Sequence, residues 1–247
     1  MWNKTYLTTI IVGAQLAATK GFQILNQRSQ SLISSKLSAE KQATFGCGCF
    51  WKPAEEILKA DGVISTVAGY TGKPDARKAP NYESVCASRD WVEGVRVTYD
   101  DEKVSYEDLL NIFYTCQEPA PGSRQYGSFI FPHDEEQGKT ASKWVNSEIS
   151  SNIEERKDGF QREWTQIEPL TKFYQAEGYH QDYWEKQRPR FAAIFVLLMA
   201  ATGILDPIIP VNTIPLATFH SVCNSATIAV AVLQLLERKL DANVVEL

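Results

Sequence analysis

The stretch FGCGCFWKPAE, Phe45–Glu55, places two cysteines one glycine apart directly before a helical pattern. Apolar residues recur at helical spacing over residues 50–58, so a helix is predicted to begin there. A cysteine just before a helix faces unpaired backbone N–H groups and the positive end of the helix dipole, which favours the thiolate. Cys49 is better placed for this than Cys47. A reactive Cys49 is therefore one interpretation, and a small buried residue is the other.

The chain has five cysteines, an odd number with irregular spacing. At least one thiol should be free unless it pairs with another chain. A strained C-x-C disulfide between Cys47 and Cys49 stays possible at this point.

The composition excludes some classes of partner and site. Charged residues make up 22% of the 247 residues and the net charge is −5, which argues against a nucleic-acid partner. No Cys/His spacing matches a zinc site, and no metal or cofactor is expected.

The middle of the chain, residues 43–187, has the sequence pattern of an α+β domain. Strands are predicted at residues 63–70, 93–101 and 127–131, with a further strand-like stretch at 165–177. Helices are predicted at residues 105–116 and 134–160.

The region after this domain is strongly apolar. From Phe191 to Leu236 the only charged residue is Asp206. The second apolar run, Ile214–Leu236, is longer than the roughly 20 residues that a transmembrane helix needs, whereas the first run is shorter. Basic residues flank both outer ends, which favours a helical hairpin that returns to one side of a membrane. The alternative is a buried hairpin in a soluble protein.

Two further segments complete the predicted organisation. Residues 1–42 are expected to form an apolar helix and a linker, with the helix packed on a membrane or on another subunit. A second linker is predicted at Arg188–Arg190, so residues 188–247 form the membrane-associated hairpin.

A series of sequence blocks carries a family resemblance. FGCGCFWKPAE is followed in order by GVISTVAGYTGK, NYESVC, VEGVRVTYDDEKVSYEDLLNIFY, EPAPGSRQYGSFIF and FYQAEGYHQDYW. Together they resemble peptide methionine sulfoxide reductase A. The resemblance implies a compact α+β domain with a mixed sheet, in which the cysteine of the G-C-F-W motif opens a helix.

The resemblance also implies a reaction. Cys49 matches the nucleophile that attacks the sulfur of methionine S-sulfoxide and is left as a sulfenic acid. Phe50 and Trp51 match the aromatic wall around the substrate methyl group. Glu93 matches the proton donor, a role that requires a raised pKa.

Two tyrosines match the residues that bind the sulfoxide oxygen. Tyr82 takes one of these places and Tyr126 the other, the second match being looser. Without the resemblance, both would be interpreted as edge-strand tyrosines.

The chain also departs from the family pattern. The loop that carries an aspartate near the active site is missing, and no residue matches that aspartate. Lys52 and Pro53 replace smaller residues after the tryptophan, so Lys52 could lower the pKa of the thiol or block the site. Trp91 replaces a small turn before the acid and could fill the cleft.

The family's glycine-rich tail with resolving cysteines is replaced by the apolar hairpin. Cys86 and Cys116 are interpreted as core positions of a strand and a helix, and Cys223 as a helix-packing residue. An external thiol reductant such as a thioredoxin would then act on Cys49 or Cys47.

The histidines have weaker assignments. His180 is interpreted as structural. His220 is expected to bind a backbone carbonyl, with a pigment metal as the alternative.

Two functional hypotheses follow. One is a membrane-anchored methionine S-sulfoxide reductase. The other is a catalytically weak or inactive subunit of an organelle membrane complex, built on the reductase fold. Either suits a thylakoid or mitochondrial inner membrane, with the lipid bilayer and other subunits as partners.

Overall fold

The computed structural model describes residues 40–120, 122–147, 156–208 and 215–247. The apolar helix predicted near the N-terminus lies almost wholly outside these residues.

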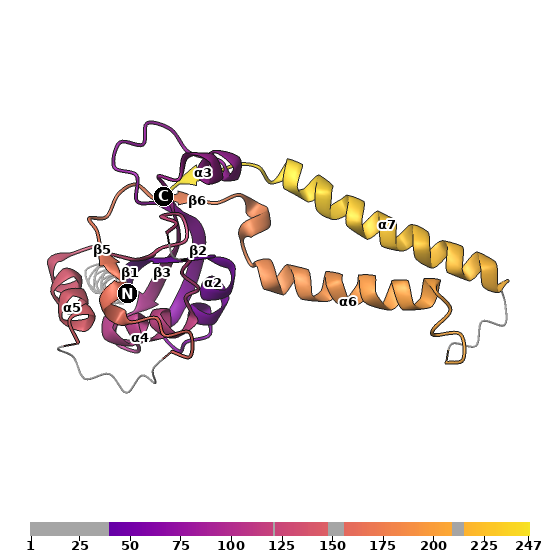
Figure 1. The fold of residues 1–247 in the computed structure, drawn as a ribbon, viewed down its shortest axis with the longest axis horizontal. Coiled ribbons are helices and arrows are strands. Elements are labelled where there is room, and N and C mark those ends of the chain that lie inside the picture. The colour runs from indigo at the N-terminus through magenta and orange to yellow at the C-terminus, as the bar shows by residue number, and fades with distance from the viewer. Residues whose placement is uncertain (1–39, 121, 148–155, 209–214) are drawn as a thin grey trace, which may run out of the picture.

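A mixed sheet forms the centre of the domain, with strand order β5-β4-β1-β3-β2-β6-β7 (Figure 1). All neighbours are antiparallel except β4 and β5, which confirms the predicted α+β class and mixed sheet. The strands are β1 (Glu40–Cys47), β2 (Val63–Thr71), β3 (Val92–Asp100), β4 (Ser128–Phe131), β5 (Gln166–Ile167), β6 (Tyr174–Gln175) and β7 (Val245–Glu246).

Helices of the domain pack on the sheet through apolar side chains. They are α2 (Trp51–Leu58), α3 (Tyr82–Ser88), α4 (Tyr106–Cys116) and α5 (Glu135–Val145), with short 3-10 turns η1 (Arg162–Trp164) and η2 (Gly178–His180). Phe45 of β1 stacks on Phe113 of α4 with ring centroids 4.9 Å apart. Both rings are fully buried, so this contact fixes the strand that leads to the cysteines against α4.

Several sequence expectations are corrected. Helix α3 was not predicted, although Asn81 and Ser84 form a capping box at its start. The predicted strand at 165–177 consists of the two short strands β5 and β6. The charged helix predicted at 134–160 ends at Val145 among the described residues, and its Trp144 is fully buried rather than facing solvent.

A long helical hairpin projects from the domain (Figure 1). It consists of α6 (Tyr183–Ala201) and α7 (Leu216–Leu240), which pack along each other. The linker predicted at Arg188–Arg190 is wrong in one respect, since these residues lie inside α6 and Pro189 is an interior helix residue. The domain therefore continues into the hairpin through an unbroken helix.

The chain returns from α7 to the sheet. Strand β7 pairs with β6, and Leu247 donates its backbone N–H to the carbonyl oxygen of Phe173 at 3.0 Å. The hairpin is consequently attached to the domain at both ends.

The hairpin carries many exposed apolar side chains. Phe195 of α6 is 64% exposed, and Ile228 and Leu233 of α7 are each 64% exposed. Among the described residues, α7 is the one helix long and apolar enough to cross a membrane. This finding is compatible with membrane association of the C-terminal hairpin.

Candidate functional site

A glycine controls the backbone between the two cysteines. Gly48 has φ +73°, and a Cβ atom there would lie 1.9 Å from the carbonyl oxygen of Glu118. Gly48 also forms a bridge with Glu118, whose N–H donates to the carbonyl oxygen of Cys47 at 2.8 Å. Only glycine fits this left-handed, crowded position. The turn places Cys49 immediately before α2.

Helix α2 begins with a turn that tolerates proline. Phe50 is its N-cap, and the first helical bond runs from the N–H of Ala54 to the carbonyl oxygen of Phe50 at 3.0 Å. Pro53 lies in the first turn, where its missing N–H would have had no helical partner. Pro53 therefore does not disturb the start of the helix beside Cys49.

The Cys49 thiol is half-buried. Burial raises its pKa from the ordinary value, and the negative charges of Glu93 and Glu118 raise it further. A hydrogen bond from the backbone N–H of Trp51 acts in the opposite direction. The backbone donor at the helix start thus favours the thiolate, as expected, but loss of hydration outweighs it and the net shift of the pKa is upward.

Glu93 of β3 provides a buried carboxyl group near this thiol. Its side chain is 2% exposed, and burial raises its pKa to about 7. Hydrogen bonds from the Gln125 side chain, the Phe50 backbone and the Tyr126 side chain lower the pKa in part. The raised pKa has the direction that a proton donor at neutral pH requires.

Gln125 is the residue that sequence reasoning missed. Its Nε2 donates to Oε1 of Glu93 at 2.7 Å, and its carbonyl oxygen accepts the Glu93 N–H at 2.9 Å. The side chain is 5% exposed. Its position next to Tyr126 was the only available signal, because the contact with Glu93 spans distant parts of the chain.

Tyr82 and Tyr126 extend this network. Burial raises the pKa of both phenols, the charge of Glu93 raises that of Tyr126 further, and the Tyr126 side chain in turn lowers the pKa of Glu93. Tyr82 is the first residue of α3, and its N–H donates to Oε1 of the buried Glu177 at 2.8 Å. Neither tyrosine belongs to a strand, so the edge-strand alternative is wrong.

The aromatic pair after Cys49 is fixed by residues from the C-terminal part of the domain. Nε1 of Trp51 donates to Nδ1 of His180 at 3.0 Å, and Tyr183 stacks on Trp51 with ring centroids 3.8 Å apart. Phe50 is 1% exposed and meets His180 edge-on. Burial lowers the pKa of His180 to about 4, so the ring is neutral and can accept from Trp51. His180 is structural in this sense, and it also positions Trp51.

The comparisons with known proteins agree with this geometry. The family model described as peptide methionine sulfoxide reductase matches residues 41–201. The chain belongs to the peptide methionine sulfoxide reductase family.

Relatives in this family cover most of the domain. A peptide methionine sulfoxide reductase MsrA of Methanothermobacter thermautotrophicus is 39% identical over 170 residues, which are 66% of this chain and 96% of the relative. The MsrA of Geobacter sulfurreducens is 38% identical over 163 residues, covering 63% of this chain and 96% of the relative. The crystal structure of reduced Mxr1 from Saccharomyces cerevisiae aligns with a TM-score of 0.46 at 25% identity, covering 62% of this chain and 87% of that chain. Methionine sulfoxide reduction is the activity that the family model and the two MsrA sequences support.

The two bulky replacements, Lys52 and Trp91, each contact a residue other than Cys49. Nζ of Lys52 lies 2.8 Å from Oε1 of Glu118 in an exposed ion pair. Trp91 is buried against Tyr174, with ring centroids 5.7 Å apart and an edge-to-face geometry. Each replacement thus has a partner other than Cys49, and Lys52 lines the same cavity as the thiol.

The other cysteines differ from one another in exposure. Cys47 and Cys116 are buried, and burial raises the pKa of both thiols. Cys86 is exposed on α3, so its interpretation as a core strand position is wrong. Cys223 is buried in α7, as a helix-packing residue would be.

His220 has a different partner from the one expected. Its Nε2 lies 2.9 Å from Oδ1 of Asp206 rather than binding a backbone carbonyl. Within the described residues, no group of three or more His, Cys, Asp or Glu side chains could hold a metal ion.

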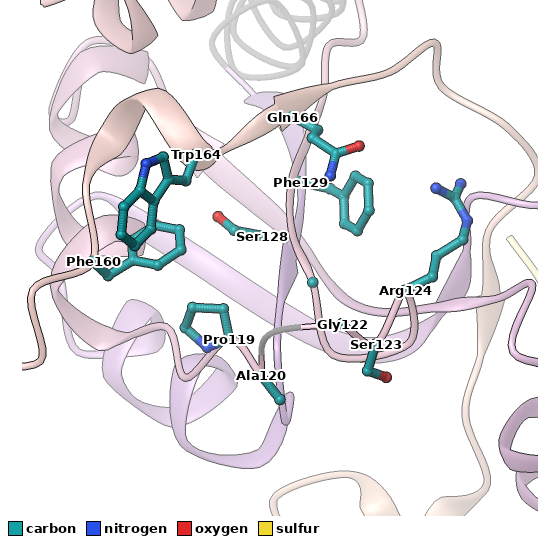
Figure 2. Close-up of a pocket in the computed structure, with 11 residues that line it drawn as sticks. Pro119, Ala120, Gly122, Ser123, Arg124, Ser128, Phe129, Phe160, Trp164 and Gln166 are labelled. Carbon is teal, nitrogen blue, oxygen red and sulfur yellow. The ribbon is translucent and has the colours of Figure 1, made fainter.

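Several cavities lie near this region, and two of them differ in whether they reach the candidate nucleophile. One, of about 380 Å³, is lined by Cys49, Trp51, Lys52, Glu55, Glu56, Glu118, Trp184 and Arg188. The other, of about 510 Å³, includes Phe160, Trp164 and Phe129 but none of the predicted site residues (Figure 2). The smaller cavity is thus the one that reaches the candidate nucleophile.

Proposed function

We propose that this chain reduces methionine S-sulfoxide with Cys49 as the nucleophile and Glu93 as the proton donor. The observation that carries this proposal is the pairing of a half-exposed cysteine at a helix start with a buried carboxyl group of pKa about 7. The pairing matters because the protonation state of each group changes the pKa of the other. The charge of Glu93 raises the pKa of Cys49, so protonation of Glu93 favours ionisation of the thiol.

The chemical step transfers one oxygen atom. The Cys49 sulfur attacks the sulfoxide sulfur while Glu93 protonates the sulfoxide oxygen, and the S–O bond of the substrate breaks. Two electrons pass from Cys49 to the substrate sulfur, which leaves as a thioether. The hydroxyl group passes to the Cys49 sulfur as the transient bond between the two sulfur atoms breaks, so Cys49 is left as a sulfenic acid, and a proton from solvent restores the protonated Glu93.

The neighbouring side chains have supporting roles in this proposal. The hydroxyl groups of Tyr82 and Tyr126 bind the sulfoxide oxygen, to which their network with Glu93 directs them. Trp51, held by His180, contributes apolar surface for the substrate methyl group, whereas the predicted wall residue Phe50 is 1% exposed and packs against Tyr70 and His180.

Regeneration requires a second reagent. A dithiol such as that of a thioredoxin would reduce the sulfenic acid, giving one disulfide and one water molecule. Cys49 is the accessible target, since Cys47 and Cys116 are buried and cannot meet an external protein. This assigns the thioredoxin-like partner to Cys49 and removes Cys47 from the role.

A steady-state assay tests the proposed reaction. The full chain should convert a methionine-S-sulfoxide peptide to the methionine peptide in the presence of dithiothreitol, and Cys49→Ser should abolish this. Cys47→Ser is the matched control, because it removes a neighbouring thiol that is fully buried. Equal activity of wild type and Cys49→Ser would refute the assignment.

We further propose that α6 and α7 attach the reductase to a lipid bilayer. The support is the 25-residue length of α7, its exposed apolar side chains and the position of charge. Arg190 and Glu237 form an ion pair where the two helices leave the domain, and Arg238 and Lys239 follow in the last turn of α7. Basic residues at this end would face the headgroup region while the remainder enters the bilayer.

Vesicle flotation tests the attachment. The full chain should float with vesicles of phosphatidylcholine and phosphatidylglycerol, and the double variant Ile228→Asp/Leu235→Asp should remain in the dense fraction. Ile64→Asp is the control, since Ile64 is an exposed apolar residue of β2 with 48% of its surface accessible. Equal flotation of all variants would contradict insertion through α7.

The alternative role, a weak or inactive subunit of a membrane complex, has less support. The family aspartate has no counterpart, but the thiol stays open to a cavity and Glu93 retains its buried network. A thylakoid or mitochondrial inner membrane remains a prediction from the apolar segments and the repair chemistry.

A further inference from the structure

The cavity beside Cys49 is lined by the nucleophile but not by the proposed proton donor or the two tyrosines. Cys49 and Trp51 line it from the start of α2, whereas Glu93, Tyr82 and Tyr126 are not among its lining residues. The groups proposed to bind the sulfoxide oxygen therefore lie outside this cavity. Its volume, about 380 Å³, falls in the range of ligand pockets, roughly 300–1,000 Å³.

Helix α6 forms one wall of this cavity. Trp184, in the first turn of α6, is half-buried and faces the cavity, and Arg188 follows one turn later. The Arg188 guanidinium binds both carboxylate oxygens of Glu55, with Nη2–Oε2 at 2.7 Å. It also lies 5.9 Å from the Trp184 ring centroid. The Arg188 guanidinium thus packs on the Trp184 ring while it is paired with Glu55.

The charged groups of the cavity are satisfied by one another. Glu118 binds Lys52, and Glu56 binds Lys59 at 2.8 Å, so neither carboxylate needs a ligand. Three carboxylates line the cavity against two cations, since Lys59 is not a lining residue. Both lining cations, Lys52 and Arg188, already have carboxylate partners, so an acidic ligand would find no free cation among the lining residues. The uncharged surface that remains is the indole of Trp184 together with Trp51.

We propose that this cavity binds the polypeptide segment flanking the oxidised methionine, and that Trp184 selects an apolar side chain next to it. The proposal rests on the function proposed above and adds a selectivity to it: apolar rather than acidic residues next to the methionine sulfoxide. The cavity is the place for this segment because Cys49 lines it. A sulfoxide that reaches Cys49 with its oxygen toward Glu93 leaves its own chain on the cavity side.

Trp184 is therefore a specificity-determining residue for the reaction. Its surface is available to a flanking side chain that stays well away from the reacting sulfur. A hydrophobic contact of this kind contributes about 10-fold or somewhat more to kcat/KM discrimination.

The test compares three substrates with the full chain and dithiothreitol. They are N-acetylmethionine S-sulfoxide methylamide, a peptide with leucine on both sides of the methionine S-sulfoxide, and the same peptide with aspartate on both sides. We expect wild type to prefer the leucine peptide over the aspartate peptide by about 10-fold or more in kcat/KM. Trp184→Ala should reduce the ratio of leucine peptide to minimal substrate toward one, and Trp184→Phe should retain most of it.

Trp164→Ala is the matched control. Trp164 is a 58% exposed tryptophan that lines the other cavity, as Figure 2 shows, so its removal should leave the substrate ratios at wild-type values. Equal kcat/KM for leucine and aspartate peptides in wild type, or an unaltered ratio in Trp184→Ala, would overturn the proposal. Absence of Cys49-dependent turnover with all three substrates would instead refute the proposed reaction itself. Using ratios within one variant separates selectivity from any loss of folded protein.

Discussion

Nε2 of Gln125 lies 2.7 Å from Oε1 of Glu93, and the backbones of the same two residues are joined by a second hydrogen bond of 2.9 Å. The side-chain bond stabilises the ionised carboxylate and so limits how far burial raises the pKa of Glu93. Gln125 therefore sets both the position and the acidity of the proposed proton donor.

Replacement of Gln125 by alanine should raise the pKa of Glu93 further above about 7. Loss of one hydrogen bond to a charged group corresponds to about one pH unit. The rise of kcat/KM with pH that reflects ionisation of Glu93 should therefore move to higher pH by about one unit. Gln161→Ala, at an exposed position, is the control. A profile that stays in place would show that Gln125 does not tune Glu93.

Replacement of Glu93 by glutamine should lower kcat by about 10²–10⁴, the usual contribution of a general acid. Attack needs one proton on the Cys49–Glu93 pair, with the sulfur ionised and the carboxyl protonated. Because the pKa of Glu93 is about 7 and that of Cys49 lies above its ordinary value, the singly protonated pair is populated between the two. Wild-type kcat/KM should rise up to about pH 7 and then level off.

The Glu93→Gln variant should lack the rise of kcat/KM that the wild type shows toward pH 7. Initial rates with methionine-S-sulfoxide peptide between pH 5 and 9 measure both effects. A wild-type profile without a limb near pH 7, or the same limb in Glu93→Gln, would contradict the assignment.

The pKa of Glu93 also predicts a pH dependence of stability. A carboxyl group whose folded pKa is raised from 4.5 to about 7 stabilises the fold below its unfolded pKa, and this contribution is lost as pH rises through 7. The free energy of unfolding of wild type relative to Glu93→Gln should fall by about 3 kcal/mol between pH 4.5 and 7.5. Urea unfolding of both chains at several pH values measures it, with Glu102→Gln at an exposed position as control. A constant difference would mean that Glu93 is not buried as described.

Replacement of Trp51 by phenylalanine should lower kcat/KM about tenfold. Phenylalanine can still stack on Tyr183, but it cannot donate to Nδ1 of His180. Removal of the donor from a buried hydrogen bond costs roughly 1–3 kcal/mol. Without this bond the ring at position 51 would be less well placed against the substrate, which lowers kcat/KM. Steady-state kinetics of Trp51→Phe and Trp164→Phe provide the comparison. Equal losses in both variants would assign the effect to general destabilisation.

Local sequence patterns predicted the part of the site that is encoded locally. The place of Cys49 before a helix follows from a short stretch, whereas Glu93 was named through the family resemblance and only its strand was predicted from local alternation. The structure places the two side chains close enough for their charges to interact. Gln125 and His180 could not be predicted in the same way. Each acts on a residue distant in sequence, Glu93 and Trp51 respectively, so the role exists only once the sheet is assembled.

The hairpin boundary was misplaced for a related reason. Polarity changes sharply at Arg188–Arg190, but a change of polarity is not a change of backbone, and α6 runs through Pro189. The return of the chain to pair β7 with β6 had no sequence signal, because a two-residue strand is defined by its partner. The thiol's pKa was misjudged because the helix start was visible in the sequence and the burial was not.

A single-turnover experiment tests the central claim most directly. The fully reduced chain is mixed with excess methionine-S-sulfoxide peptide in the absence of any reductant, and the methionine peptide formed is quantified beside peptide mass spectrometry of the protein. The account predicts at most one methionine peptide per chain, with one added oxygen on Cys49 and no product in Cys49→Ser. Product formation without oxidation of Cys49, or equal product in Cys49→Ser, would contradict it.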